Sequence, residues 1–395
     1  MGASLALAAL VSACGGGDSS PTPPTTVDAP GDDFDRLALL ANLGENIVLP
    51  LYTQFSAETA ELEAAVGAYC EGLGGADEDS LRAAAQAGWQ AAMSTWQQAE
   101  VMQFGPVAMD DGAPRDVIYS WSIVSSCAVD QDVNLYRQDP AAYDISARLT
   151  NRRGLDALEY VLFQPDLNHT CPSQTAPEGW DALDDAARAA ARCGYAEVAA
   201  TDLAAQAAGL RDAWHPDGGN YVASFASAEG FASAQAALNV VTDAMFYLDT
   251  ETKDMKLAEP AGIAENQCSS MGTPCEPELE SPYAERSREH VIGNLTGIQR
   301  IYLGEGLDGT DGVGFDEFLR ALGAADLADQ MTAAIAGAIT AAEAVPGTMR
   351  GALASDYDTV VAAHAAVKAI TDLIKSQFLT VLGLDLPESG GSDND

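Results

Sequence analysis

The sequence predicts an all-α protein made of two similar helical-bundle halves. Apolar residues recur at three- and four-residue spacing over long stretches, alanine is abundant throughout, and we find no alternating strand pattern of any length. The 395 residues allow one large domain or two or three ordinary ones, and 47% hydrophobic residues is normal for a globular chain. We therefore expect long helices in one or two up-down bundles.

The expected helices follow one another from residue 34. The first apolar pattern covers 34–70 and contains Pro50, which predicts a kink or a change of helix. Ser80 is a candidate N-cap for the second helix, which closes near Gly105. Further helices are expected at 116–136, within 140–163, and at 181–214, 227–257, 285–304, 315–344 and 354–382.

Two short segments resemble each other and raise the question of an internal duplication. Residues 151–158 match 294–301 in the asparagine, the glycine and both aliphatic positions. Because the match is short, chance similarity and duplication both remain open. We place the N-terminal half at 34–215 and the C-terminal half at 216–386, followed by a disordered acidic tail at 387–395.

The N-terminus indicates export and lipid anchoring. Residues 1–13 form an apolar run too short to span a bilayer, and the stretch from Val11 to Cys14 resembles a bacterial lipobox, in which the signal peptide is cut before a lipid-bearing cysteine. The basic residues that normally precede such a run are missing. Residues 14–33, rich in Gly, Ser, Pro and Thr, are typical of a flexible tether. We expect a protein of the bacterial cell envelope that faces the periplasm or the cell surface and meets the membrane only through its lipid.

The charge of the chain limits its partners. With 19 Lys and Arg against 59 Asp and Glu, the formal net charge is −40, which repels nucleic acid and anionic lipid headgroups and favours cations. An acidic solvation shell suited to a saline habitat and a functional attraction for cations are both compatible with this composition.

Cysteine usage agrees with an oxidising compartment. If Cys14 carries the lipid, six cysteines remain, which is an even number. Proximity in the sequence suggests the pairs Cys268–Cys275 and Cys171–Cys193, which leaves Cys70–Cys127. No CxxC motif occurs, so thiolate metal sites and redox motifs are not expected.

One pair of carboxylates stands out as a candidate site. Asp156 and Glu159 are three residues apart in an expected helix and therefore share one face, where two like charges are unfavourable unless something cationic lies nearby. A metal, a proton transfer or a substrate would explain the pair. Arg152 and Arg153, four and three residues before Asp156, could instead satisfy it through a local ion pair.

Four segments in order carry a family resemblance: ANLGENIVLPLYTQF at 41–55, WQAAMSTWQQAEVMQFGP at 89–106, GLDALEYVLF at 154–163 and SPYAERSREHVIGNLTGIQRIYLG at 281–304. Read together, they resemble the imelysin family, the M75 peptidase-like lipoproteins and periplasmic proteins, over most of 36–385. The resemblance implies an imelysin-like helical fold and a role near bacterial iron uptake.

The resemblance also places the site and shows a departure. Where the family carries Gly-x-His-x-x-Glu, this chain has Gly154, Asp156 and Glu159, so an oxygen ligand replaces a nitrogen ligand. The change favours hard cations such as ferric iron or calcium and makes proteolysis doubtful. The resemblance further implies lesser candidates in a cleft between the halves: Glu45, Asn46, Arg288 and Asn294. Arg153, next to the motif, is a further lesser candidate.

We expect a binding protein that captures iron or an iron-bearing ligand at Asp156 and Glu159 and serves iron uptake, with an iron-transport membrane protein as a candidate partner. Zinc, copper and calcium remain alternatives to iron. Two other functions stay open: a metallopeptidase with Glu159 as ligand or base, and a non-catalytic structural lipoprotein whose acidic surface meets another envelope protein.

Overall fold

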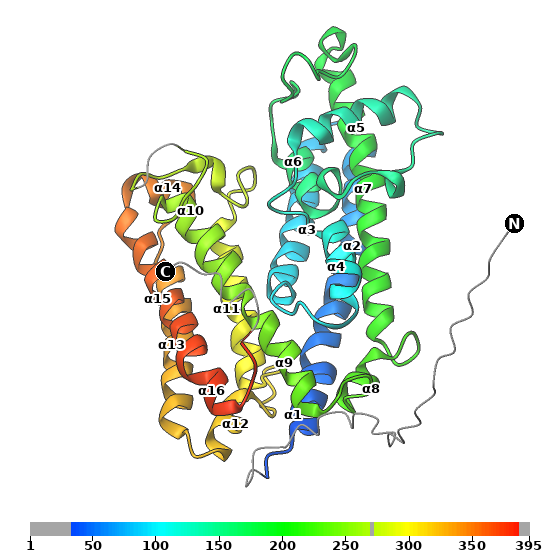
Figure 1. The fold of residues 1–395 in the computed structure, drawn as a ribbon. Helices are drawn as coiled ribbons and strands as arrows, with labels where there is room; N and C mark the ends of the chain where they lie inside the picture. The colour runs from blue at the N-terminus through cyan, green and yellow to red at the C-terminus, as the bar shows by residue number, and fades with distance from the viewer. Residues whose placement is uncertain (1–32, 269–271, 387–395) are drawn as a thin grey trace, which may run out of the picture.

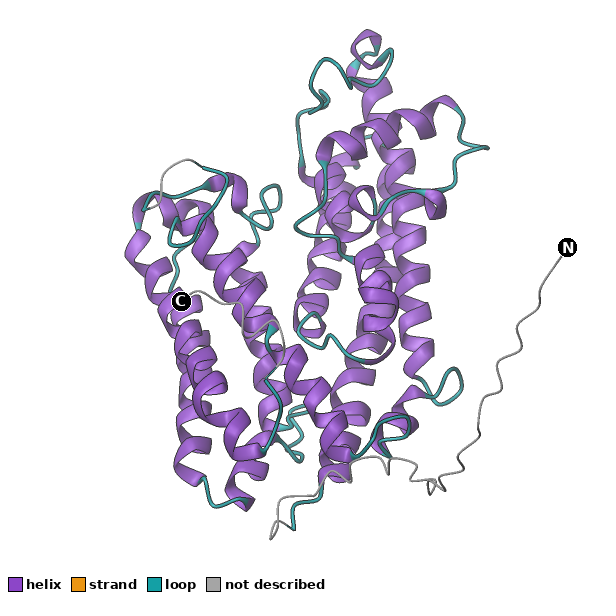
Figure 2. Ribbon diagram, in the orientation of Figure 1, coloured by secondary structure: helices purple, strands orange, loops and turns teal. Residues whose placement is uncertain are grey.

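The computed structural model describes residues 33–268 and 272–386, and over these residues the chain is helical without β-strands (Figures 1 and 2). The predicted all-α class is thereby confirmed. The predicted signal peptide, Cys14 and the acidic tail at 387–395 lie outside the described residues. The α-helices are α1 (Arg36–Asn42), α2 (Leu49–Glu71), α3 (Glu78–Ala99), α4 (Met109–Ile118), α5 (Ser126–Gln138), α6 (Gly154–Phe163), α7 (Asp185–Trp214), α8 (Tyr221–Ala226), α9 (Ala234–Met245), α10 (Glu259–Ala261), α11 (Ser287–Leu303), α12 (Phe315–Ala321), α13 (Ala325–Glu343), α14 (Met349–Ser355), α15 (Tyr357–Leu373) and α16 (Leu379–Leu382).

Shorter helical forms complete the chain. Three π-helical segments are η1 (Leu43–Val48), η6 (Leu248–Ala258) and η8 (Ile374–Phe378). The 3₁₀ turns are η2 (Gly105–Ala108), η3 (Ile145–Ala147), η4 (Thr150–Arg152), η5 (Trp180–Ala182) and η7 (Glu276–Glu278).

The helices form two groups that meet along α3 and α11. In the N-terminal half, α2 packs against α3 and α7, and α6 lies between α3 and α7 (Figure 1). In the C-terminal half, α13 packs against α11 and α15, and α15 packs against η6. Because α11 also packs against α3, the two halves share one continuous apolar core. Its largest buried side chains include Trp89, Trp96, Trp180 and Trp214.

The interruption expected at Pro50 is confirmed as a change of helix. The π-helical η1 ends at Val48, and α2 begins at Leu49 with Pro50 in its first turn. A proline is tolerated there because the N–H groups of a first helical turn have no partner within the helix itself.

Several predicted boundaries are wrong. Asp77, not Ser80, is the N-cap residue of α3. The helix expected at 116–136 is interrupted at 119–125, because α4 ends at Ile118 and the Ser125 hydroxyl caps a new helix by accepting from the Ala128 N–H at 3.3 Å. The segments expected at 227–257, 315–344 and 354–382 are likewise divided into shorter helices.

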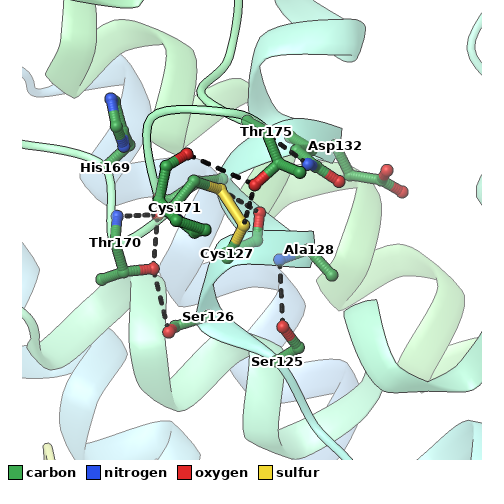
Figure 3. Close-up of a disulfide and its surroundings, with 12 residues drawn as sticks. Ser125, Ser126, Cys127, Ala128, Asp132, His169, Thr170, Cys171 and Thr175 are labelled. Carbon is green, nitrogen blue, oxygen red and sulfur yellow. Dashed lines mark hydrogen bonds between the residues drawn. A yellow bond between two sulfur atoms is a disulfide. The ribbon is translucent and has the colours of Figure 1, made fainter.

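Two of the three predicted disulfide pairs are wrong, although all six cysteines of the described residues are paired. The structure joins Cys70 to Cys193, Cys127 to Cys171, and, as predicted, Cys268 to Cys275. Proximity in the sequence fails as a guide because α2 and α7 lie side by side, which brings the Cα atoms of Cys70 and Cys193 to 5.4 Å. Figure 3 shows how Cys127, in the first turn of α5, meets Cys171, where the Thr170 hydroxyl donates to the Ser126 hydroxyl at 2.9 Å.

The two similar segments differ in local structure. Gly154 has a left-handed φ of +81° at the start of α6, whereas Gly297 lies within α11. Their comparison therefore gives no support to a duplication. Within the described residues, no helix combines the length and the apolarity needed to cross a membrane.

Candidate functional site

The glycine of the Gly-x-Asp-x-x-Glu motif sets the position of α6. Its φ of +81° is a conformation that residues with a side chain rarely adopt. A Cβ atom on Gly154 would also lie 2.5 Å from the Ile118 carbonyl oxygen, which is far too close. A glycine therefore allows α6 to begin directly against the end of α4 and turns its acidic face toward residues 119–123.

Asp156 and Glu159 line one cavity of about 180 Å³ between the two halves. Their side chains are buried, with exposed fractions of 4% and 2%. Leu155, Leu158 and Leu162 are buried on the same helix, as the predicted core-facing stripe requires. The remaining walls come from residues 121–126 and from residues 277–283 of the C-terminal half.

Asp156 has one strong hydrogen-bond donor and several acidic neighbours. The Ser120 N–H donates to its Oδ2 at 2.8 Å. Burial raises the pKa of the Asp156 carboxyl well above its usual value, and the charges of Glu159, Glu280 and Glu100 raise it further against the opposing effect of the Ser120 N–H. The Asp156 carboxyl therefore keeps its proton to a higher pH than an exposed aspartate does.

Glu159 ties the N-terminal half to a turn of the C-terminal half. Its Oε1 accepts from the Ser281 hydroxyl at 2.9 Å and from the backbone N–H groups of Tyr283 at 3.0 Å and Ala284 at 2.8 Å. Burial raises the pKa of Glu159, while these donors and the charge of His290 oppose the rise.

The two arginines before the motif do not pair with Asp156. Arg153 makes a buried two-pronged ion pair with Asp202, with Nε at 2.9 Å from Oδ2, and Arg152 pairs with Asp132 at 2.8 Å. The alternative of a local ion pair is thus wrong, because both guanidinium groups reach other helices. Arg153 is a residue that stabilises the fold and lies outside the cavity lining.

A third cavity carboxylate, Glu280, is neutralised from the C-terminal half. The Lys256 Nζ lies 2.9 Å from its Oε1, the Tyr119 hydroxyl donates to the same oxygen, and the His290 Nδ1 lies 3.2 Å from its Oε2. Burial tends to raise the pKa of Glu280, but Lys256 and His290 outweigh it and hold the pKa at about 2. Glu280 is therefore ionised at neutral pH.

Asn294 belongs to the polar network behind this cavity. Its Nδ2 donates to Glu100 Oε2 at 3.0 Å and to the Gln97 carbonyl oxygen at 2.8 Å. Lys256 donates to the same Glu100 oxygen at 2.8 Å. The predicted candidate Asn294 thus joins α11 to α3 and does not line the cavity.

The other lesser candidates lie elsewhere. Glu45 and Asn46 are exposed on η1, where the Asn46 amide donates to Asn42 Oδ1 at 2.9 Å. Arg288 donates to the Val345 carbonyl oxygen at 3.0 Å and pairs with Glu289. These contacts are local or hold turns to helices. The structure does not bring Glu45, Asn46 or Arg288 to the cavity.

The site combines an excess of buried acid with little compensating charge. We call Asp156, Glu159, Glu280 and Glu100 the acid cluster, and Lys256 is the lysine that contacts it. In the part of the chain that the structure describes, no three His, Cys, Asp or Glu side chains are grouped to hold a metal ion. The arrangement suits a cation that brings water or its own organic ligands, because the cavity has room for them.

Sequence reasoning missed Glu280, Lys256, Glu100 and Tyr119. Glu280 directly precedes the Ser-Pro-Tyr that contributed to the family resemblance, and Lys256 is one of only 19 basic residues in the chain. These signals could have drawn attention to them. Their convergence could not be foreseen, since they lie up to 180 residues apart.

The comparisons with known proteins agree with the fold. A family model described as Imelysin, of the M75 peptidase group, matches residues 48–377. A protein from Parabacteroides distasonis, described as an iron-regulated protein A precursor, has a crystal structure with a TM-score of 0.67 at 18% identity, covering 88% of this chain and 98% of that one. An imelysin-like protein from Psychrobacter arcticum has a TM-score of 0.66 at 17% identity, covering 90% and 99%. No curated protein matches the chain.

Proposed function

The chain belongs to the imelysin family, and from this premise we propose that it is a cell-envelope binding protein that captures iron or an iron-bearing ligand between its two halves. The proposed site is the cavity that Asp156 and Glu159 line. The protein would serve iron uptake and be held to the membrane through Cys14.

One observation carries the proposal: three carboxylates, those of Asp156, Glu159 and Glu280, line a single buried cavity that has no lysine or arginine in its wall. Burying so much acid is unfavourable without a counter-charge. Lys256 contacts Glu280, whereas no cationic side chain among the described residues bonds to Asp156, whose pKa burial raises. A cation bound beside Asp156 would supply a counter-charge and compete with its protonation.

Oxygen ligands alone favour a hard cation, for which ferric iron is the leading choice. The iron-regulated description of the Parabacteroides distasonis protein supports iron over calcium as the first metal to test. At 18% identity, that similarity shows a shared fold and does not identify a metal. The choice of iron is therefore part of our proposal.

The metallopeptidase alternative draws less support from these residues. Zinc hydrolysis generally needs about three protein ligands and a water molecule. Asp156 stands where the family has histidine, so the motif lacks the nitrogen ligand expected of a zinc-peptidase helix. We therefore favour binding over catalysis.

The test is a titration of the purified protein with ferric citrate, ferrous iron, zinc, copper and calcium. Asp156→Asn and Glu159→Gln serve as site variants, and Glu45→Gln serves as a surface control with the same change in charge. We expect stoichiometric iron binding that releases protons and is weakened at least about tenfold in both site variants, a change of about 1.4 kcal/mol. Equal iron binding by all four proteins would overturn the proposal.

A further inference from the structure

A second cavity, of about 210 Å³, lies beside the first and carries a separate inference. It shares Trp121 and Ser122 with the first cavity but is otherwise lined by different residues. One wall comes from α4 and residues 119–123, and the other comes from η6 of the C-terminal half. The cavity contains neither Asp156 nor Glu159.

The Ser120 hydroxyl is the first sign of a ligand. Ser120 lines this cavity and is only 2% exposed, and no group of residues 33–268 or 272–386 forms a hydrogen bond with its Oγ. Its backbone N–H is already committed to Asp156. A buried hydroxyl without a partner is unfavourable, so a donor supplied by a bound molecule would satisfy it.

Glu251 is the second sign. Its carboxylate receives a hydrogen bond from the neighbouring Thr250 hydroxyl, and among the described residues no Lys or Arg forms an ion pair with it. Burial raises its pKa, with Glu100 adding to the rise and Thr250 and Lys256 opposing it. The Glu251 carboxylate therefore has Lys256 as a nearby positive charge but no direct ion pair among the described residues.

The other charged groups of this cavity are already satisfied. Arg115 pairs with Asp116 at 2.6 Å, and each is about one-third exposed, so this pair is balanced. Glu100 accepts from Lys256 at 2.8 Å, from Asn294 at 3.0 Å and from the Tyr247 hydroxyl at 2.5 Å. Glu251 remains as the carboxylate available to a ligand.

Aromatic side chains form part of the cavity wall. The Lys256 Nζ lies 5.6 Å from the Trp121 ring centre and 5.5 Å from the Tyr247 ring centre, so its ammonium group already occupies the side of each ring that it faces. Met255 adds an apolar surface. A small ligand with one ammonium group and a short alkyl chain would match such walls.

We propose that this second cavity binds a small organic cation with a primary ammonium group, which donates to the Glu251 carboxylate and the Ser120 Oγ while its alkyl part packs against Trp121 and Met255. The proposal is independent of cation binding in the first cavity, because the two cavities use different carboxylates.

Calorimetric titration of the purified protein with n-butylammonium chloride tests the proposal. Sodium chloride holds the ionic strength constant, and a pH of about 8 favours the ionised form of Glu251, whose pKa burial raises. The variants are Glu251→Gln and Ser120→Ala, with the exposed Glu61→Gln as a control of equal charge change. n-Butanol, which has the same chain without the charge, is the control ligand.

We expect saturable binding of n-butylammonium, weakened about tenfold or more by Glu251→Gln and several-fold by Ser120→Ala. Glu61→Gln should bind as the unmodified protein does, and n-butanol should not saturate. Thermal unfolding of each variant verifies that it is folded. The proposal is overturned if no saturable binding occurs or if Glu251→Gln binds the amine unchanged.

Asp156→Asn separates the two cavities. Under the proposal it keeps its affinity for n-butylammonium within about twofold, even if it loses iron. If Asp156→Asn lost the amine while Glu251→Gln retained it, the amine would occupy the first cavity, and the assignment of the second cavity would fail.

Discussion

The Lys256 Nζ of the C-terminal half lies 2.8 Å from Glu100 Oε2 of the N-terminal half, and neither side chain is more than 3% exposed. The same ammonium lies 2.9 Å from Glu280 Oε1. One lysine on η6 thus contacts two buried carboxylates, one from each half of the chain. Removing it would leave Glu100 without its ion pair and Glu280 with His290 alone as a charged partner.

Lys256→Met should destabilise the protein by about 3–5 kcal/mol, the cost of breaking a buried ion pair from one side. Urea unfolding at neutral pH measures this loss. The matched control is Lys368→Met, because Lys368 pairs with Asp372 at 3.1 Å while both side chains are exposed by a third or more. That variant should lose about 1 kcal/mol or less. Equal losses in the two variants would contradict the role given to Lys256.

The raised pKa of Asp156 predicts a pH-dependent effect of Asp156→Asn. The carboxyl titrates near 3.8 in the unfolded chain and higher in the folded one, so the folded state holds the proton more tightly. Its stabilising contribution is complete below 3.8 and is lost as the pH rises through the folded pKa. The asparagine variant lacks this loss and should gain stability over the unmodified protein, by up to about 1.4 kcal/mol per pH unit between the two pKa values.

Urea unfolding of both proteins at a series of pH values checks this expectation. Glu280, with its pKa held at about 2, is present in both proteins and cancels in the difference. A stability difference that stayed constant from acidic to neutral pH would contradict the prediction, because it would show that folding leaves the pKa of Asp156 unchanged.

Gly154→Ala should cost several kcal/mol, because the added Cβ would lie 2.5 Å from the Ile118 carbonyl oxygen in addition to the strain of φ +81°. Gly179→Ala is the matched control: its φ is +77°, but no atom lies within 4 Å of the added Cβ. The control should lose about 1 kcal/mol from strain alone. Thermal unfolding distinguishes the two, and equal shifts would mean that the approach to Ile118 imposes no constraint.

The three disulfides should contribute in the order of the loops that they close. The separations are 123 residues for Cys70–Cys193, 44 for Cys127–Cys171 and 7 for Cys268–Cys275. Loop-closure entropy gives about 5, 4 and 2.5 kcal/mol, respectively. Replacing each pair with alanine and measuring urea unfolding tests the order. A larger loss for Cys268–Cys275 than for Cys70–Cys193 would refute the entropic explanation.

The helical class and the acidic pair could be predicted because both depend on local information. Leu155, Leu158 and Leu162 repeat with the period of a helix, so their burial follows from spacing. The same spacing places Asp156 and Glu159 on one face. Helix ends were less predictable. Ser125 lies inside the helix expected at 116–136, but it caps a new helix, α5, and this interruption depends on residues 119–125 contacting α6.

Composition and residue spacing alone indicate the helical class, the family resemblance, the Asp156–Glu159 motif and the six cysteines that follow Cys14. The packing of distant helices is what pairs Arg153 with Asp202 and Cys70 with Cys193, and what lets Lys256 join Glu100 to Glu280. Helical periodicity specifies which side of a helix is buried, but it carries no information about which distant side chain meets it. The counter-charges of a buried acid come from elements far away in the chain, and packing alone brings them together.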